Sequence, residues 1–270
     1  DGLSLLCYRY DFALAAVIIL LVMKAVKIDI RRKPKGKLFL TAVFYVGFMA
    51  FQVAGLFYAT SVEGSIIFAV VPIIVKIIAS LFLKEKSSWL ENIFICTTVT
   101  ALIFMIVMGT SHIEIDPLGT ALLLISSMMM AMSNIFMRYT RNDYKPIEIT
   151  VSIIALGFVV FNGAALLRAF VRGGSLAGYL EPLAVPQVFI AAAYLGIGCI
   201  LLSAHLMSYM LSKMEAAKGT IFGNLSTAIS IVAGVAVLGE SLMWYHVVCT
   251  AVIIGSVIGM SLSGRKGELQ

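Results

Sequence analysis

Charged side chains are scarce in this sequence. Asp, Glu, Lys and Arg together make up 13% of its 270 residues, while 61% are hydrophobic, against the roughly 45–50% apolar content of an ordinary soluble domain. The mean hydropathy is +1.02. A soluble fold cannot hide this much apolar surface, so the composition excludes an ordinary soluble domain and indicates a chain that lies in a lipid bilayer.

Cysteines and catalytic motifs are also few. The four cysteines lie in apolar runs without CxxC spacing, which is typical of small packing residues rather than of disulfides or metal ligands. The chain has no HExxH, Gly-Lys-Ser/Thr or GxSxG motif, and its three histidines lie in three different regions. We therefore expect no catalytic residue, no bound metal and no cofactor, and an intramembrane enzyme is the least favoured class.

Acidic residues are absent from the middle of every apolar run. Proton-coupled transporters commonly use a carboxylate at that depth as a proton relay. If the chain moves solutes, this absence favours facilitated efflux or exchange over strong proton coupling.

Long apolar runs dominate what is present. Each is close to the ~20 residues that a helix needs to cross ~30 Å of hydrocarbon, and none alternates with the period of two expected of barrel strands. The nine runs lie at 3–26, 38–59, 62–83, 89–109, 117–138, 146–170, 186–211, 217–238 and 242–262. The sequence therefore predicts an all-α, polytopic membrane helical bundle.

Part of the chain is a copy of another part. The stretch from Gly64 to Met105 matches the stretch from Gly219 to Met260 at an offset of 155 residues. The matched pairs include Gly64 and Gly219, Leu83 and Leu238, Glu85 and Glu240, Trp89 and Trp244, and Met105 and Met260. We interpret this as a duplication whose copies cross the membrane in opposite directions, an arrangement found in many secondary transporters.

The duplication predicts two repeats, 1–109 with four spans and 110–270 with five. The first repeat therefore lacks the partner of the 117–138 span, which would precede Asp1. We expect the natural protein to contain a further N-terminal helix, which would complete an inverted 5+5 repeat of ten spans. A protein of nine spans with its N-terminus outside stays open as the alternative.

Most lysines and arginines lie in the connections between the spans. Sixteen lysines and arginines fall in alternate connections and in the C-terminal tail, whereas the other connections hold only Arg168 and Arg172. By the positive-inside rule, the basic connections and the C-terminus are cytoplasmic. The formal net charge of +6 is thus a topology signal and does not indicate nucleic-acid binding. We expect a multi-pass protein of the cell membrane, such as a bacterial inner membrane.

Several motifs resemble those of EamA-type members of the drug/metabolite transporter superfamily. Pro72 followed thirteen residues later by Glu85 matches that family's repeat, and the second copy keeps Glu240 without the proline. The stretch from Leu6 to Tyr10 resembles the Arg-aromatic opening of the family's second helix, and Arg138 resembles the end of its sixth. The resemblance covers essentially the whole chain. It implies a ten-helix transporter or exporter of small metabolites such as amino acids, without an ATPase.

Lys76 is the first candidate for a substrate-binding residue. It lies well inside the 62–83 span, four residues after Pro72. An ammonium at this depth is costly unless it faces a cavity or a partner. The alternative is that its long side chain reaches along the helix to the cytoplasmic interface near Leu83. Pro72 removes a helix hydrogen bond, so we expect an interruption of the span there.

Other polar side chains lie at similar depth. Gln52, Asn162 and Asn224 are near the middle of their runs, and His205 is nearer the cytoplasmic side. Each of them alone is more typical of a hydrogen bond between helices. Together they are what a central polar site requires, so we predict that the three amides converge with Lys76 on one cavity.

Arg9 is the remaining candidate, in the outer third of the first run beside Tyr8, Tyr10 and Asp11. Pairing with Asp11 or anchoring at the membrane interface is the favoured interpretation. An arginine flanked by phenols can also bind a carboxylate through two hydrogen bonds, so Arg9 is kept as a substrate-binding candidate.

The leading functional hypothesis is a secondary-active or facilitative transporter that exports small polar metabolites, amino acids or related compounds, by alternating access of the two repeats. A membrane structural or lipid-handling protein of the same fold is the alternative. The expected partners are a small-molecule substrate and the lipid bilayer, with a homodimer left open and no nucleic acid.

Overall fold

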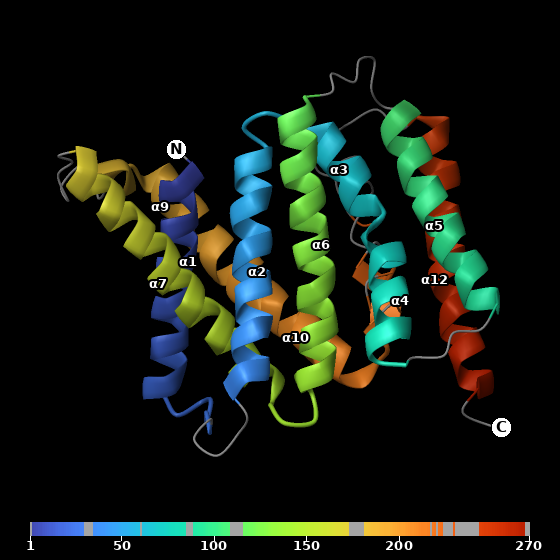
Figure 1. Cartoon of the computed structure of the whole chain (residues 1–270), viewed down its shortest axis with the longest axis horizontal. Helices are drawn as coiled ribbons and strands as arrows, with labels where there is room; N and C mark the ends of the chain where they lie inside the picture. The colour runs from blue at the N-terminus through green and yellow to red at the C-terminus, as the bar shows by residue number, and fades with distance from the viewer. Residues whose placement is uncertain are drawn as a thin grey trace. The chain divides into compact units, whose positions relative to one another are not determined.

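The computed structural model of the chain is built from helices. It describes residues 2–29, 35–59, 61–84, 89–108, 116–172, 181–216, 218–219, 221–223, 229 and 243–267. The first helices are α1 (Gly2–Val22), α2 (Lys35–Gly55), α3 (Ser61–Ala69), α4 (Val71–Phe82) and α5 (Trp89–Met108). They are followed by α6 (Pro117–Thr140), α7 (Pro146–Arg172), the 3-10 helix η1 (Glu181–Ala184), α9 (Pro186–Ala193), the π-helix η2 (Tyr194–Leu202), α10 (Ser203–Lys213) and α12 (Trp244–Gly267). The described residues contain no strand, which confirms the all-α class (Figure 1).

Six described segments are long and apolar enough to cross a membrane. They are α1, α2, α5, α6, α7 and the continuous segment Pro186–Lys213. Two shorter apolar stretches, Ile67–Phe82 and Val247–Gly259, fall in the predicted spans 62–83 and 242–262. The predicted span 217–238 lies almost entirely outside the described residues. The chain is a polytopic helical membrane protein, as its sequence predicts.

The predicted interruption at Pro72 is confirmed. The 62–83 span consists of two helices, α3 and α4, which are separated at Val70, and Pro72 occupies the first turn of α4. Proline has no N–H to donate, so the carbonyl of Phe68 lacks the donor that a continuous helix would supply. The interruption therefore follows from the sequence itself.

The chain packs into two compact units. Unit 1 comprises Asp1–Gly47 and Phe136–Lys213, and unit 2 comprises Phe48–Ile135 and Met214–Gln270. The boundaries fall inside α2 and α6, so each unit combines helices from both predicted repeats. The repeats 1–109 and 110–270 describe the sequence duplication, and the units describe which helices pack together.

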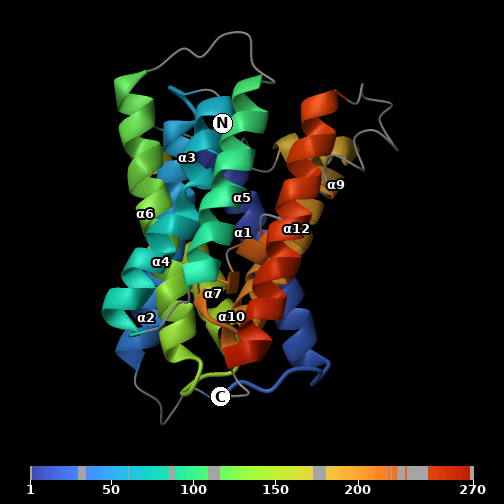
Figure 2. The same ribbon diagram turned by 90° about the vertical axis from the view of Figure 1, so that its right-hand side faces the viewer.

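In unit 2, two helices that correspond by the duplication pack against each other. Figures 1 and 2 show α5 and α12 side by side, running in opposite directions. Met105 near the end of α5 clusters with Cys249 near the start of α12. Towards the other end of the pair, a side chain at Gly259 would meet the ring of Phe94. The two copies of this helix are therefore antiparallel, as an inverted repeat requires.

In unit 1, α1 is enclosed by α7 and η2. Tyr10 is fully buried against α7, where its ring lies 5.1 Å from that of Phe161 and occupies the space that a side chain at Gly157 would need. On the other side, a Cβ at Gly196 of η2 would lie 2.6 Å from the carbonyl oxygen of Arg9. Glycine at these two positions lets the backbones approach closely.

Candidate functional site

Arg9 lies in a polar group inside unit 1. It interacts electrostatically with the phenol of Tyr45 in α2 and with that of Tyr10 in its own helix. Cys199 of η2 lies near Tyr45. Tyr45 and Cys199 are close to the middle of their apolar segments, Lys35–Gly55 and Pro186–Lys213. We call Arg9, Tyr10, Tyr45 and Cys199 the Arg9 cluster, and it brings together α1, α2 and η2.

Two donors of the Arg9 cluster lack partners. Within the described residues, the Nε atom of Arg9 and the hydroxyl of Tyr10 are buried without a hydrogen-bond partner. The described part of the chain also contains no ion pair between Arg9 and Asp11. The Asp11 carboxylate instead accepts a hydrogen bond of 2.7 Å from the side-chain amide of Asn162. The pairing of Arg9 with Asp11 that the sequence favoured is therefore not formed.

The helix beside Arg9 has an unusual form. The nine residues of η2 form a π-helix between two α-helical segments. π-helical turns are rare and occur frequently at functional sites. Gly196 lies in this stretch and contacts α1 at Arg9 and Phe12, so the widened turns lie directly against the Arg9 cluster.

Asn162 and His205 are also in unit 1. Asn162 links α7 to α1 through Asp11, which is the interhelical role that the sequence favoured for each amide. His205 is half-buried in α10. Its Nδ1 atom is buried without a hydrogen-bond partner among the described residues.

Lys76 lies in unit 2 and has acidic neighbours. It is half-buried and interacts electrostatically with Glu91 and Glu215. Lys218 pairs with the same two carboxylates, at 2.8 Å from Glu91 and 3.1 Å from Glu215. A cavity of about 370 Å³ between α4 and α5 is lined by Lys76 together with Asn92 and other side chains. Two carboxylates of its own unit thus lie near Lys76, and Lys218 shares both of them.

Gln52 and Asn224 are the two remaining predicted site residues. Gln52 is half-buried in the part of α2 that belongs to unit 2. Asn224 lies outside the described residues. The structure joins Asn162 to the helix of Arg9, and it places Lys76 and Gln52 in the other unit. The convergence of the three amides with Lys76 on one cavity stays a prediction.

Sequence reasoning missed Glu91 and Tyr45. Glu91 is only 6% exposed although it is the third residue of α5. A carboxylate just inside an apolar run needs a partner, and this requirement could have drawn attention to it. Tyr45 stands in the middle of an apolar run, where a phenol needs a hydrogen bond. Neither residue has a sequence motif that reveals its partner.

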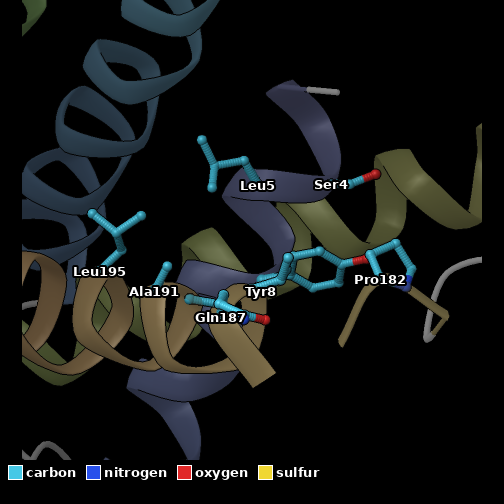
Figure 3. Close-up of a pocket in the computed structure, with 9 residues that line it drawn as sticks. Ser4, Leu5, Tyr8, Pro182, Gln187, Ala191 and Leu195 are labelled. Atoms are coloured by element: carbon cyan, nitrogen blue, oxygen red, sulfur yellow. The ribbon is translucent and has the colours of Figure 1, made fainter. Parts of the chain in front are cut away.

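A second cavity in unit 1 lies beside the start of α1. Its volume is about 450 Å³, and it is lined by Ser4, Leu5 and Tyr8 of α1 and by residues of η1, α9 and η2. Figure 3 shows Tyr8 reaching from α1 towards Pro182 and Gln187. The described part of the lining is mostly apolar and has no charged side chain, so these residues offer no group that could recognise an ion.

These features define a class of protein: a polytopic α-helical membrane protein with an inverted duplication and polar groups among its spans. The model of the EamA-like transporter family matches the chain in two stretches, residues 1–107 and 117–262. The chain belongs to the EamA-like transporter family, and it is a transporter. The two matched stretches fall on either side of the predicted repeat boundary.

Relatives and a solved structure agree with this assignment. The chain is 34% identical over 98% of its length to the uncharacterized transporter YcxC of Bacillus subtilis (strain 168), of which it covers 86%. It is 25% identical over 94% of its length to an uncharacterized transporter of Archaeoglobus fulgidus, of which it covers 84%. A protein of known crystal structure aligns with 99% of this chain and 89% of its own, with a TM-score of 0.80 at 12% identity. At that identity the likeness shows the fold alone.

Proposed function

We propose that the chain is a secondary-active or facilitative exporter of small polar metabolites, amino acids or related compounds, and that it works by alternating access of its inverted repeats. The observation that carries the proposal is the antiparallel packing of the corresponding helices α5 and α12. Two structures related by inversion can exchange conformations, which exposes one central site to each side in turn. The buried polar atoms of unit 1 support a polar rather than an apolar substrate.

Counterflow in liposomes tests the proposal. Liposomes containing the purified protein are loaded with an unlabelled amino acid, organic acid or nucleoside and diluted into a trace of the same labelled compound. We expect transient accumulation of label for at least one compound, because exchange through an alternating site needs no external energy. Protein-free liposomes are the control. No accumulation above this control for any compound would contradict transport of small polar metabolites.

We further propose that the basic connections and the C-terminus face the cytoplasm. Asn142 is exposed in the connection that carries Arg138, Arg141 and Lys145, and Glu181 is exposed in the opposite connection. In a chain without its native cysteines, a membrane-impermeant thiol reagent should label Asn142→Cys only in inside-out vesicles and Glu181→Cys only in right-side-out vesicles. Labelling of both positions from one side would exclude the inverted topology.

Lys76 stays a proposed contact to the substrate. Lys76→Met should abolish transport, whereas Lys76→Arg should keep part of it, because a fixed charge in a low-dielectric site contributes more than side-chain bulk. Both variants should stay folded, because Lys218 still pairs with Glu91. The measurement is counterflow together with the melting temperature. Transport by Lys76→Met at the wild-type rate would show that Lys76 only reaches towards the interface.

A further inference from the structure

We propose that the guanidinium of Arg9 binds the carboxylate of the transported metabolite, with the hydroxyl of Tyr10 as a second donor. The inference rests on the proposed transport function and names the substrate class that the Arg9 cluster recognises. It rests on three observations: Arg9 has a buried donor and no carboxylate partner among the described residues, Lys76 differs from it in having carboxylates nearby, and the ring of Tyr10 is held in place.

The first observation is a buried donor of a charged group, since Arg9 is half-buried and its Nε atom has no hydrogen-bond partner among the described residues. The Nε atom of Arg9 is buried without a partner among the described residues, whereas a long side chain that anchors at the interface keeps its polar end in water. No carboxylate of the described residues pairs with Arg9, and the nearest one in sequence, Asp11, is bound by Asn162. A cation within an apolar span is costly unless a group of opposite sign completes it, and a bound carboxylate would supply that group.

The second observation is the contrast with Lys76. Lys76 has Glu91 and Glu215 in its surroundings, whereas no carboxylate of the described residues pairs with Arg9. Of these two cations within the spans, Arg9 is therefore the one to which we assign the carboxylate of the substrate. A single guanidinium balances one negative charge, and its planar fork matches the two oxygens of a carboxylate. A phosphate dianion would need further cations, which the Arg9 cluster does not contain.

The third observation is that the second donor is held in place. Tyr10 is 0% exposed, and its ring packs between Gly157 and Phe161 of α7. Tyr10 and Tyr45 both interact electrostatically with Arg9. An anion bound to Arg9 can therefore also accept a hydrogen bond from the Tyr10 hydroxyl, which has no other partner among the described residues. Donors that are held in place before the ligand binds lose little entropy on binding.

The experiment compares binding of carboxylates and of the matched amides, which lack the carboxylate charge, by purified protein in detergent. The probes are L-leucine, L-phenylalanine, succinate and butyrate, with L-leucinamide, L-phenylalaninamide, succinamide and butyramide as matched amides and inorganic phosphate as a second anion. We expect at least one carboxylate to raise the melting temperature, while its amide and phosphate do not. Stabilisation by none of the carboxylates, or equally by an acid and its amide, overturns the proposal.

Two substitutions at Arg9 locate the site. Arg9→Gln should weaken binding of the stabilising carboxylate by about 10- to 100-fold, and Arg9→Lys should weaken it less. Arg141→Gln, the same change in a connection of the same unit, should leave binding unchanged. Equal binding by Arg9→Gln and the wild type would exclude Arg9 as the anion site.

The unliganded variants separate binding from a structural role. If Arg9 waits for a ligand, Arg9→Gln should melt at or above the temperature of the unliganded wild type, because an uncompensated buried charge is removed. If Arg9 is instead paired within the fold, Arg9→Gln should melt several degrees lower, and this result overturns the proposal. If the protein binds a carboxylate but shows no counterflow, the carboxylate site stands and the proposed transport function fails. Failure of the site and failure of transport can therefore be distinguished.

Discussion

Replacing Glu91 by leucine is expected to destabilise the protein by about 3–5 kcal/mol. Glu91 is only 6% exposed and forms an ion pair of 2.8 Å with Lys218. It also interacts electrostatically with Lys76. Without Glu91, two lysines would share Glu215, whose side chain is 32% exposed. An ammonium that loses its partner inside a protein keeps its desolvation cost without the compensating attraction, so the loss should exceed that of a surface ion pair.

Thermal unfolding of purified variants in detergent measures this effect. Glu215→Gln removes the more exposed carboxylate and should cost much less. The double variant Glu91→Leu, Lys218→Met should be more stable than Glu91→Leu alone, since it removes one of the two cations that would share Glu215. A double variant that is less stable than Glu91→Leu would show that the ion pair does not explain the loss.

Gly157→Ala is expected to cost about 1–3 kcal/mol or more, because it overpacks the contact between α7 and α1. The added methyl group would occupy the place of the Tyr10 ring, and Tyr10 is fully buried beside Phe161. The ring of Tyr10 or the backbone of α7 must therefore shift to admit the methyl group. A shift of Tyr10 would also displace its hydroxyl, so we expect carboxylate binding to weaken together with stability.

The same helix supplies the control for this change. Gly163 of α7 has nothing within 4 Å of an added Cβ, so Gly163→Ala should leave the melting temperature unchanged or raise it slightly through the higher helix propensity of alanine. The loss caused by Gly157→Ala should also be smaller in a Tyr10→Ala background. If Gly157→Ala lowered the stability by the same amount in the wild type and in the Tyr10→Ala background, Gly157 and Tyr10 would not compete for one space.

Most helices of this fold could be predicted from the sequence, because each needs only a long apolar run and a polar connection. The interruption at Pro72 could equally be predicted, since it depends on one residue that cannot donate a backbone hydrogen bond. The antiparallel packing of α5 and α12 agrees with the duplication. The compact units were not predictable in this way, because they depend on which helices of the two repeats pack together.

The candidate site was less predictable because partners come from distant parts of the chain. Lys76 drew attention as a cation inside a span, but its neighbour Glu215 follows 139 residues later, and no local pattern links the two. For Arg9, closeness in sequence was misleading. Residues two apart point about 200° away from each other on an α-helix, so Asp11 faces α7 and not the side of Arg9. Within the described residues, tertiary packing and not sequence spacing decides that no carboxylate pairs with Arg9.

Access to Cys199 from the two sides of the membrane tests the central claim most directly. Cys199 is half-buried in η2 and belongs to the Arg9 cluster. The measurement uses a chain in which Cys7, Cys96 and Cys249 are replaced by alanine, in right-side-out and inside-out vesicles, with a small charged methanethiosulfonate that cannot cross the bilayer. Alternating access predicts that Cys199 is modified from both sides and that a bound carboxylate slows the reaction from both. Modification from one side only, or from neither, would contradict a site that opens to each side in turn.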